Sequence, residues 1–305
     1  MSTVMPRIHL GSWANDVVDW LTDHWQPFFD GLASVINHPV DWITDLLTKD
    51  VPVIAIIIAA ALIAWLTRGW KASILSAVGF LLIDGLDQFE PMVQTLSQVL
   101  VGSIIAIAIA IPVGIWAARS KRTSTVVRPI LDFMQTLPPY VYVLPGLFLM
   151  GLGAANAVLA TVVFAMPPGV RLTELGIRQV DDEMVEAGQA FGATPREVLR
   201  EIQMPLALPS IMAGINQIIM LSLSMVVIAA AVGAPGLGAG IFQGLSQLDV
   251  GLGVEAGVSV VILAMYLDRV TDGLTKPQLG LRSEVERIRS RGRAAATMFG
   301  AGMTH

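Results

Sequence analysis

The residues with the most informative spacing lie in the segment QVDDEMVEAGQAFGATPREVLREIQMPLALPSI, residues 179–211. Asp181 is a favourable helix N-cap, and Gly192 can end a helix in the left-handed conformation. Thr194 and Glu197 have the T-x-x-E spacing of a capping box, which predicts a second helix start. The segment is therefore expected to fold as two short helices that meet at a glycine bend.

This segment offers a binding surface, and it carries no catalytic group. Small residues on its first helix would let another protein approach closely, and Phe191 supplies one apolar side chain of the kind that anchors interfaces. The small residues are Ala187, Gly188 and Ala190. An ordinary helical hairpin packed on its own neighbours is the alternative interpretation.

Several classes of catalytic or metal site are not expected from the sequence. The chain has no cysteine, and its four histidines lie near its two ends. The phosphate-loop pattern G-x-x-x-x-G-K-[ST] is absent, so ATP binding of the usual kind is not expected. The glycine-rich run 233–240 lacks a preceding strand and the full nucleotide-loop spacing, and is expected to be a flexible turn. We expect no catalytic residue and no metal site.

The elements that must position the segment 179–211 are apolar helices. The chain is 54% hydrophobic and 14% charged, with a mean hydropathy of +0.68, against about 25% charged residues in soluble domains. Crossing about 30 Å of hydrocarbon takes roughly 17–25 apolar residues as a helix. We expect an all-α polytopic bundle of about seven spans in residues 51–272, comprising Val51–Thr67, Ala72–Ile83, Thr95–Ala117, Thr136–Gly151, Ala154–Pro168, Leu206–Val232 and Gly253–Leu267.

Basic residues set the orientation. With the N-terminus outside, all of the 19 lysines and arginines except Arg7 and Lys49 fall in cytoplasmic loops or after the last span, where seven lie between Arg269 and Arg293, most of them in the cytoplasmic tail 273–305. Because positive charge concentrates in cytoplasmic loops, we predict an outside N-terminus and an inside C-terminus in a bacterial cell membrane. The segment 179–211 then faces the cytosol.

The seven stretches contain one residue of the types Asp, Glu, Lys, Arg and His, which is Glu255, the third residue of the last stretch. Carriers driven by an ion gradient usually place an ionisable residue at membrane depth, so a single glutamate near the end of one stretch disfavours a secondary transporter. Energy for active transport would have to enter through a partner protein.

The first 50 residues form an extracytoplasmic region of a different kind. Apolar residues, several of them tryptophan, recur there at helical spacing with aspartates opposite them. We expect short helices lying on the outer leaflet, or alternatively a helical cap packed on the ends of the spans. Seven aspartates against Arg7 and Lys49 provide no basic face for anionic lipid.

The loop resembles the EAA loop of importer permeases, whose usual form is E-A-A, three residues, G, nine residues, I-x-L-P. The matching positions are Glu186, Ala187, Gly188, Gly192, Ile202 and Pro205. Gly188 replaces the second alanine and Met204 replaces the leucine, both within the same size class. In that family the loop, here 181–205, docks into a groove on the ATPase, which implies a coupling role for Glu186, Ala187, Gly188, Phe191 and Gly192.

The resemblance extends beyond the loop, since roughly residues 63–272 are similar to permeases of glycine betaine/proline betaine import systems. Choline and carnitine importers have the same type of permease. The resemblance implies a permease homodimer, two ATP-binding-cassette ATPase subunits that hold ATP and Mg, and an extracytoplasmic substrate-binding protein. The chain ends about 35 residues after the last expected span, so a separate binding protein is expected. No enzymatic activity, no cofactor in this chain and no nucleic-acid partner are expected.

The residues that line a translocation path are harder to predict. Asn216 and Gln217 fall within the sixth stretch, where an amide in lipid needs a partner or water, and a helix–helix hydrogen bond is the alternative role. Tyr140 and Tyr142 could hold a quaternary ammonium group by cation–π attraction, or could simply lie in an interfacial aromatic belt. Two functional alternatives stay open, namely a same-fold permease for another solute such as an amino acid or methionine, and a gradient-driven carrier.

Overall fold

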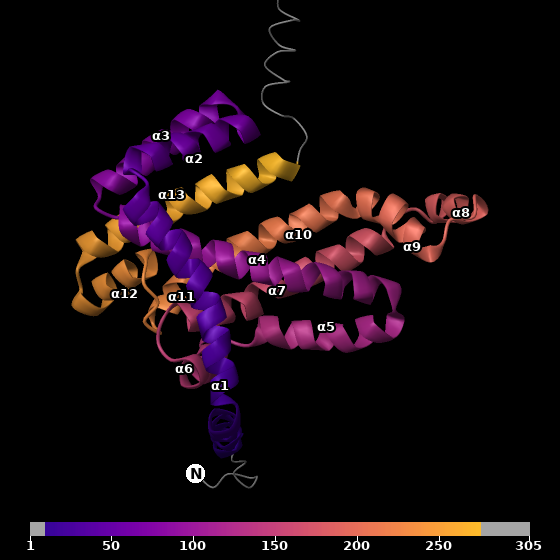
Figure 1. The fold of residues 1–305 in the computed structure, drawn as a ribbon, viewed down its shortest axis with the longest axis horizontal. Coiled ribbons are helices and arrows are strands. Elements are labelled where there is room, and N and C mark those ends of the chain that lie inside the picture. Colours follow the sequence, from indigo (N-terminus) through magenta and orange to yellow (C-terminus); the bar gives the residue numbers. More distant parts are fainter. Residues whose placement is uncertain (1–9, 276–305) are drawn as a thin grey trace, which may run out of the picture.

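The computed structural model describes residues 10–275, and every regular element in that range is a helix (Figure 1). The expected all-α fold is therefore confirmed for this part of the chain. Most of the predicted basic tail, 273–305, lies outside the described residues.

The N-terminal region forms one long helix, α1 (Leu10–Asp45), which crosses the direction of the other long helices (Figure 1). The prediction of several short helices is wrong, because α1 continues through Pro27 and Pro39. Ile36 and Val40 are buried in a cluster with residues of α4 and α7, and this packing keeps the helix intact across the second proline. Large apolar side chains elsewhere on α1, including four tryptophans, are exposed.

A short π-helix, η1 (Leu46–Asp50), ends α1, and the chain then bends by 115° into α2 (Val53–Arg68). Helix α3 (Trp70–Gly85) folds back on α2 across Gly69. An ion pair between Arg68 and Asp272 connects this hairpin to the last helix.

Three long helices form the centre of the bundle. They are α4 (Phe89–Arg119), α7 (Ala154–Arg178) and α10 (Met204–Ser224), which lie side by side (Figure 1). Ala106, Ala110 and Ala165 are fully buried where α4 meets α7. Small residues of this kind allow membrane helices to pack closely without a hydrophobic driving force between them.

Between α4 and α7 the chain forms α5 (Lys121–Thr136) and α6 (Pro139–Met150), so the expected fourth span, 136–151, is reduced to the shorter helix α6. Leu137 adopts an extended conformation before Pro138, as expected because proline disfavours the helical conformation in the preceding residue. The twelve residues of α6 span only about 18 Å as a helix, too little to cross a bilayer core.

The remaining elements follow α7 in the order α8 (Asp182–Ala190), α9 (Pro195–Glu197), η2 (Val198–Gln203), α10, α11 (Val226–Ala230), α12 (Leu237–Gln247) and α13 (Val250–Thr275). The glycine-rich run 233–240 is held against α4 and enters α12 at Leu237, so it differs from the predicted flexible turn. Gln98 Nε2 donates to Pro235 O at 2.7 Å, and Leu237 N donates to Thr95 Oγ1 at 2.9 Å.

Within the described residues, four helices are long and apolar enough to cross a membrane, and a fifth span results if α1 with η1 and the bent α2 count as one. The four are α4, α7, the continuous run 195–230 and α13. They correspond to the third, fifth, sixth and seventh stretches predicted from sequence, the sixth of which extends two residues beyond its helical run. The predicted number of about seven is too high by this measure because α2 and α3 have 16 residues each and α6 has 12.

Candidate functional site

The segment 181–205 projects from one end of the bundle, beyond the ends of α4 and α5 (Figure 1). Asp181 Oδ1 accepts a hydrogen bond from Glu183 N at 3.1 Å and caps α8. The α8 helix ends at Ala190, and Gly192 has a φ of +86°. The predicted first helix and glycine bend are confirmed, with both ends where the sequence placed them.

The second helix begins at Thr194 with the predicted capping box. Glu197 N donates to Thr194 Oγ1 at 3.4 Å, and Thr194 N donates to Glu197 Oε2 at 2.7 Å. The helix continues past Pro205, because the π-helix η2 joins α9 to α10 and the run continues to Ala230. The second helix of the segment is therefore continuous with a membrane-spanning helix.

The tip of the segment presents an apolar side chain to its surroundings. Phe191 is 92% exposed, and Glu186 and Ala187 are also exposed. Gly188 lies on the other side of α8, where a Cβ atom would stand 2.4 Å from Ile202 Cδ1. Of the predicted coupling residues, Glu186, Ala187, Phe191 and Gly192 thus form an outward surface, while Gly188 packs against η2 of its own chain.

A cavity of about 440 Å³ separates the segment from the bundle end. Its walls come from the end of α4, the end of α7, α8 and η2, and include Arg119, Arg178, Asp182, Gln189 and Gln203. Arg178, the last residue of α7, therefore lies between the bundle and the projecting segment.

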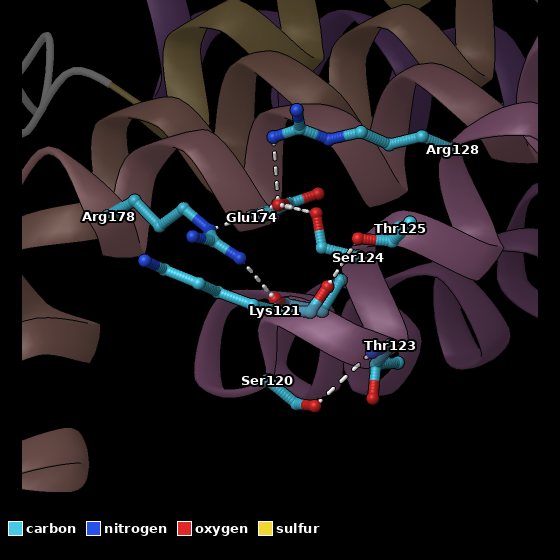
Figure 2. Close-up of polar contacts among 9 residues, drawn as sticks. Ser120, Lys121, Thr123, Ser124, Thr125, Arg128, Glu174 and Arg178 are labelled. Carbon is cyan, nitrogen blue, oxygen red and sulfur yellow. Dashed lines mark hydrogen bonds and ion pairs between the residues drawn. The ribbon is translucent and has the colours of Figure 1, made fainter.

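A buried carboxylate, Glu174, contacts Arg178 (Figure 2), and both residues line a second cavity of about 300 Å³. The Glu174 side chain is 4% exposed, and its Oε1 accepts hydrogen bonds from Ser124 Oγ at 2.8 Å and Arg128 Nη2 at 3.0 Å. Arg178 Nε lies 3.0 Å from the same oxygen, and Arg178 Nη2 donates to Ala117 O at 2.7 Å. One carboxylate and one guanidinium thus connect α4, α5 and α7.

Sequence reasoning missed Glu174 because the expected fifth span ended at Pro168, which left Glu174 among loop charges. The signals were present in the spacing, since Glu174 and Arg178 are four apart, as are Ser124 and Arg128. A second ion pair, between Asp132 and Arg171, connects α5 to α7. Both residues line the cavity of about 300 Å³, and the Asp132 side chain is 63% exposed.

Asn216 forms a hydrogen-bond network between two spans. Asn216 Nδ2 donates to Asp268 Oδ1 at 3.4 Å, and Thr271 Oγ1 donates to Asn216 Oδ1 at 2.7 Å. The helix–helix role that the sequence left open is therefore the one that the structure shows for this residue. Gln217 is exposed, and both amides line a cavity of about 440 Å³ together with Asp272.

The two tyrosines predicted for the path lie in α6 and differ in their surroundings. Tyr140 is 52% exposed. Tyr142 is half-buried, and its hydroxyl has no hydrogen-bond partner among the described residues. The structure does not bring either tyrosine together with Asn216 and Gln217 in the cavity that these amides line.

Comparison with known proteins begins with a family match. Residues 110–276, which include the projecting segment and Glu174, match the family described as "Binding-protein-dependent transport system inner membrane component". This range covers more than half of the chain.

Two curated bacterial proteins are similar over most of the chain. The glycine betaine transport system permease protein OpuAB of Bacillus subtilis is 47% identical over 271 residues, which cover 88% of this chain and 95% of OpuAB. The glycine betaine/proline betaine transport system permease protein ProW of Escherichia coli is 42% identical over 267 residues, covering 88% of this chain and 75% of ProW.

Among solved structures, an inward-facing form of the MetNI methionine ABC transporter matches with a TM-score of 0.55. The sequence identity is 22%, and the alignment covers 59% of this chain and 91% of the other. This likeness supports the fold of a type I importer permease.

Proposed function

Because the chain belongs to the family of binding-protein-dependent transport system inner membrane components and is the permease subunit of an ATP-binding-cassette transporter, we propose that it carries glycine betaine or a related quaternary ammonium solute inward. Proline betaine, choline and carnitine are the related solutes. The observation that carries this proposal is the 47% identity to a glycine betaine permease along 95% of its length.

Family and fold imply ATPase partner subunits for this membrane protein. The finer assembly that we propose has two permease copies, two ATPase subunits that bind ATP and Mg, and an extracytoplasmic binding protein that delivers the solute. This chain hydrolyses nothing itself and holds no cofactor. We further propose that α1 lies along the outer leaflet, since Trp13, Trp20 and Trp42 are exposed on it and tryptophan favours the membrane interface.

The proposed mechanism is alternating access driven through the segment 181–205, which we call the coupling loop. ATP closes the two ATPase subunits, and the two docked α8 helices move together. Because α9, η2 and α10 form one continuous run, displacement of the loop moves a membrane span directly. The inner mouth of the path then closes while the outer mouth opens.

Uptake into proteoliposomes tests this function. Vesicles contain the permease and the proposed ATPase partner, with the binding protein outside and ATP trapped inside. We expect labelled glycine betaine to accumulate only with ATP and to be displaced by excess proline betaine. Vesicles that lack the ATPase are the matched control and should accumulate nothing.

Two results would favour the alternatives. Uptake of the same size without the ATPase would indicate a gradient-driven carrier. ATP-dependent uptake of methionine or another amino acid, with no uptake of betaines, would keep the transporter class and reject the proposed solute.

A further inference from the structure

Glu174 is the one charged residue that the structure buries within residues 11–273, since the other buried polar residues there are uncharged. Withdrawing a carboxylate from water is costly unless donors surround it. Replacing a buried ion pair with apolar residues of similar volume is often neutral or stabilising. A packed apolar side chain could therefore join α5 to α7 at least as well, so that stability alone does not account for the charge.

The position of Glu174 in the chain suggests another role. It lies seven residues before Asp181, where the coupling loop begins, and one turn before Arg178, where α7 ends. Arg178 uses Nε on Glu174 and Nη2 on the Ala117 carbonyl, and the same side chain lines the cavity under the loop. The ion pair is thus the polar connection between the base of the loop and the ends of α4 and α5 (Figure 2).

We propose that Glu174 and Arg178 are positioning residues that transmit movement of the coupling loop to α4 and α5. When the loop moves, α7 carries the pair with it. The directional bonds to Ser124, Arg128 and Ala117 then require α4 and α5 to follow. This role rests on the proposed function, because it concerns how ATP hydrolysis on a partner is converted into solute import.

The uncharged variant Glu174→Gln separates this role from a structural one. Glutamine keeps the size and one acceptor oxygen, but it loses the charge that holds both guanidinium groups. In the proteoliposome assay we expect normal assembly and ATP hydrolysis within about twofold of wild type. Solute import should fall about tenfold, within the range of roughly 5–150-fold that coupling free energies cover. ATP hydrolysed per solute imported should therefore rise about tenfold.

Asp132→Asn is the matched control. Asp132 forms an ion pair with Arg171 that also connects α5 to α7, but the Asp132 side chain is 63% exposed. Exposed ion pairs contribute little because water screens them. We expect its ratio of ATP to solute to stay at the wild-type value.

Arg178→Lys is the second test variant. Lysine keeps the positive charge but lacks the planar fork that contacts Glu174 and Ala117 at once. We expect it to raise the ATP-to-solute ratio in the same direction as Glu174→Gln.

Three results would overturn the positioning role. The first is an unchanged ratio of ATP hydrolysed to solute imported in Glu174→Gln, and the second is a fall of hydrolysis and import in the same proportion. The third is failure of both variants to assemble, which would show that the residues are needed only for the structure. Failure of the proposed function itself is distinguishable, because then the wild-type vesicles would show no ATP-dependent betaine import at all.

Discussion

Substituting valine for Gly192 is expected to lower both ATPase association and betaine uptake about tenfold, the factor that corresponds to roughly 1.4 kcal/mol. Gly192 has a φ of +86°, and an added Cβ would meet nothing within 4 Å. The cost is therefore one of backbone conformation, since a left-handed residue other than glycine costs about 1–2 kcal/mol and a β-branched one is a clear outlier. Binding of the purified ATPase to permease in nanodiscs, together with uptake, measures the effect.

Gly192→Asn is the control for this prediction. Asparagine is close to valine in size but adopts positive φ far more readily. We expect it to retain most of the wild-type binding and uptake. Equal losses in the asparagine and valine variants would show that bulk at the bend is what matters, and the conformational explanation would be wrong.

Substituting alanine for Gly114 is expected to destabilise the permease by about 2–3 kcal/mol, in the upper part of the range for overpacked cores. Gly114 lies where α4 meets α7, and a Cβ there would stand 2.6 Å from Thr173 Cβ and 2.8 Å from Val170 O. One of the two opposing atoms is backbone, so rotation of a side chain cannot relieve the contact. Thermal unfolding in detergent, with the amount of protein inserted in membranes, measures the loss.

Gly257→Ala makes the same chemical change inside α13, where a Cβ would meet nothing within 4 Å. It should leave the unfolding temperature unchanged or raise it slightly, because alanine is favoured over glycine by about 0.5–1 kcal/mol in a helix. Equal stability of the two variants would contradict the close approach of α4 and α7.

The coupling loop was the part of the fold best predicted from sequence, because its signals are local. Asp181, Gly192, Thr194 and Glu197 act within three or four residues of themselves, and the structure places both helix starts and the bend where these residues indicate. Helix lengths were predicted less well. The continuation of α1 through Pro39 depends on packing of Ile36 and Val40 against other helices, which no local pattern reveals.

The polar cluster was missed for a related reason, although the spacing within each helix was visible in the sequence. The role of Glu174 depends on its hydrogen bonds with Ser124 and Arg128, which are 50 and 46 residues away in sequence. A carboxylate a few residues after an apolar stretch is interpreted as part of an exposed loop unless the helix is known to continue. Asn216 differs, since its amide in an apolar helix already indicated a need for a partner, which Asp268 and Thr271 supply.

The central claim is that the tip of the coupling loop lies in the cytosol and is covered by the ATPase. The chain has no cysteine, so the variant Phe191→Cys places a single thiol at that tip. A membrane-impermeant maleimide should label it in inside-out vesicles stripped of the ATPase, and added ATPase should protect it. Labelling from the outside of intact cells, or labelling in inside-out vesicles that the ATPase leaves unchanged, would contradict the claim.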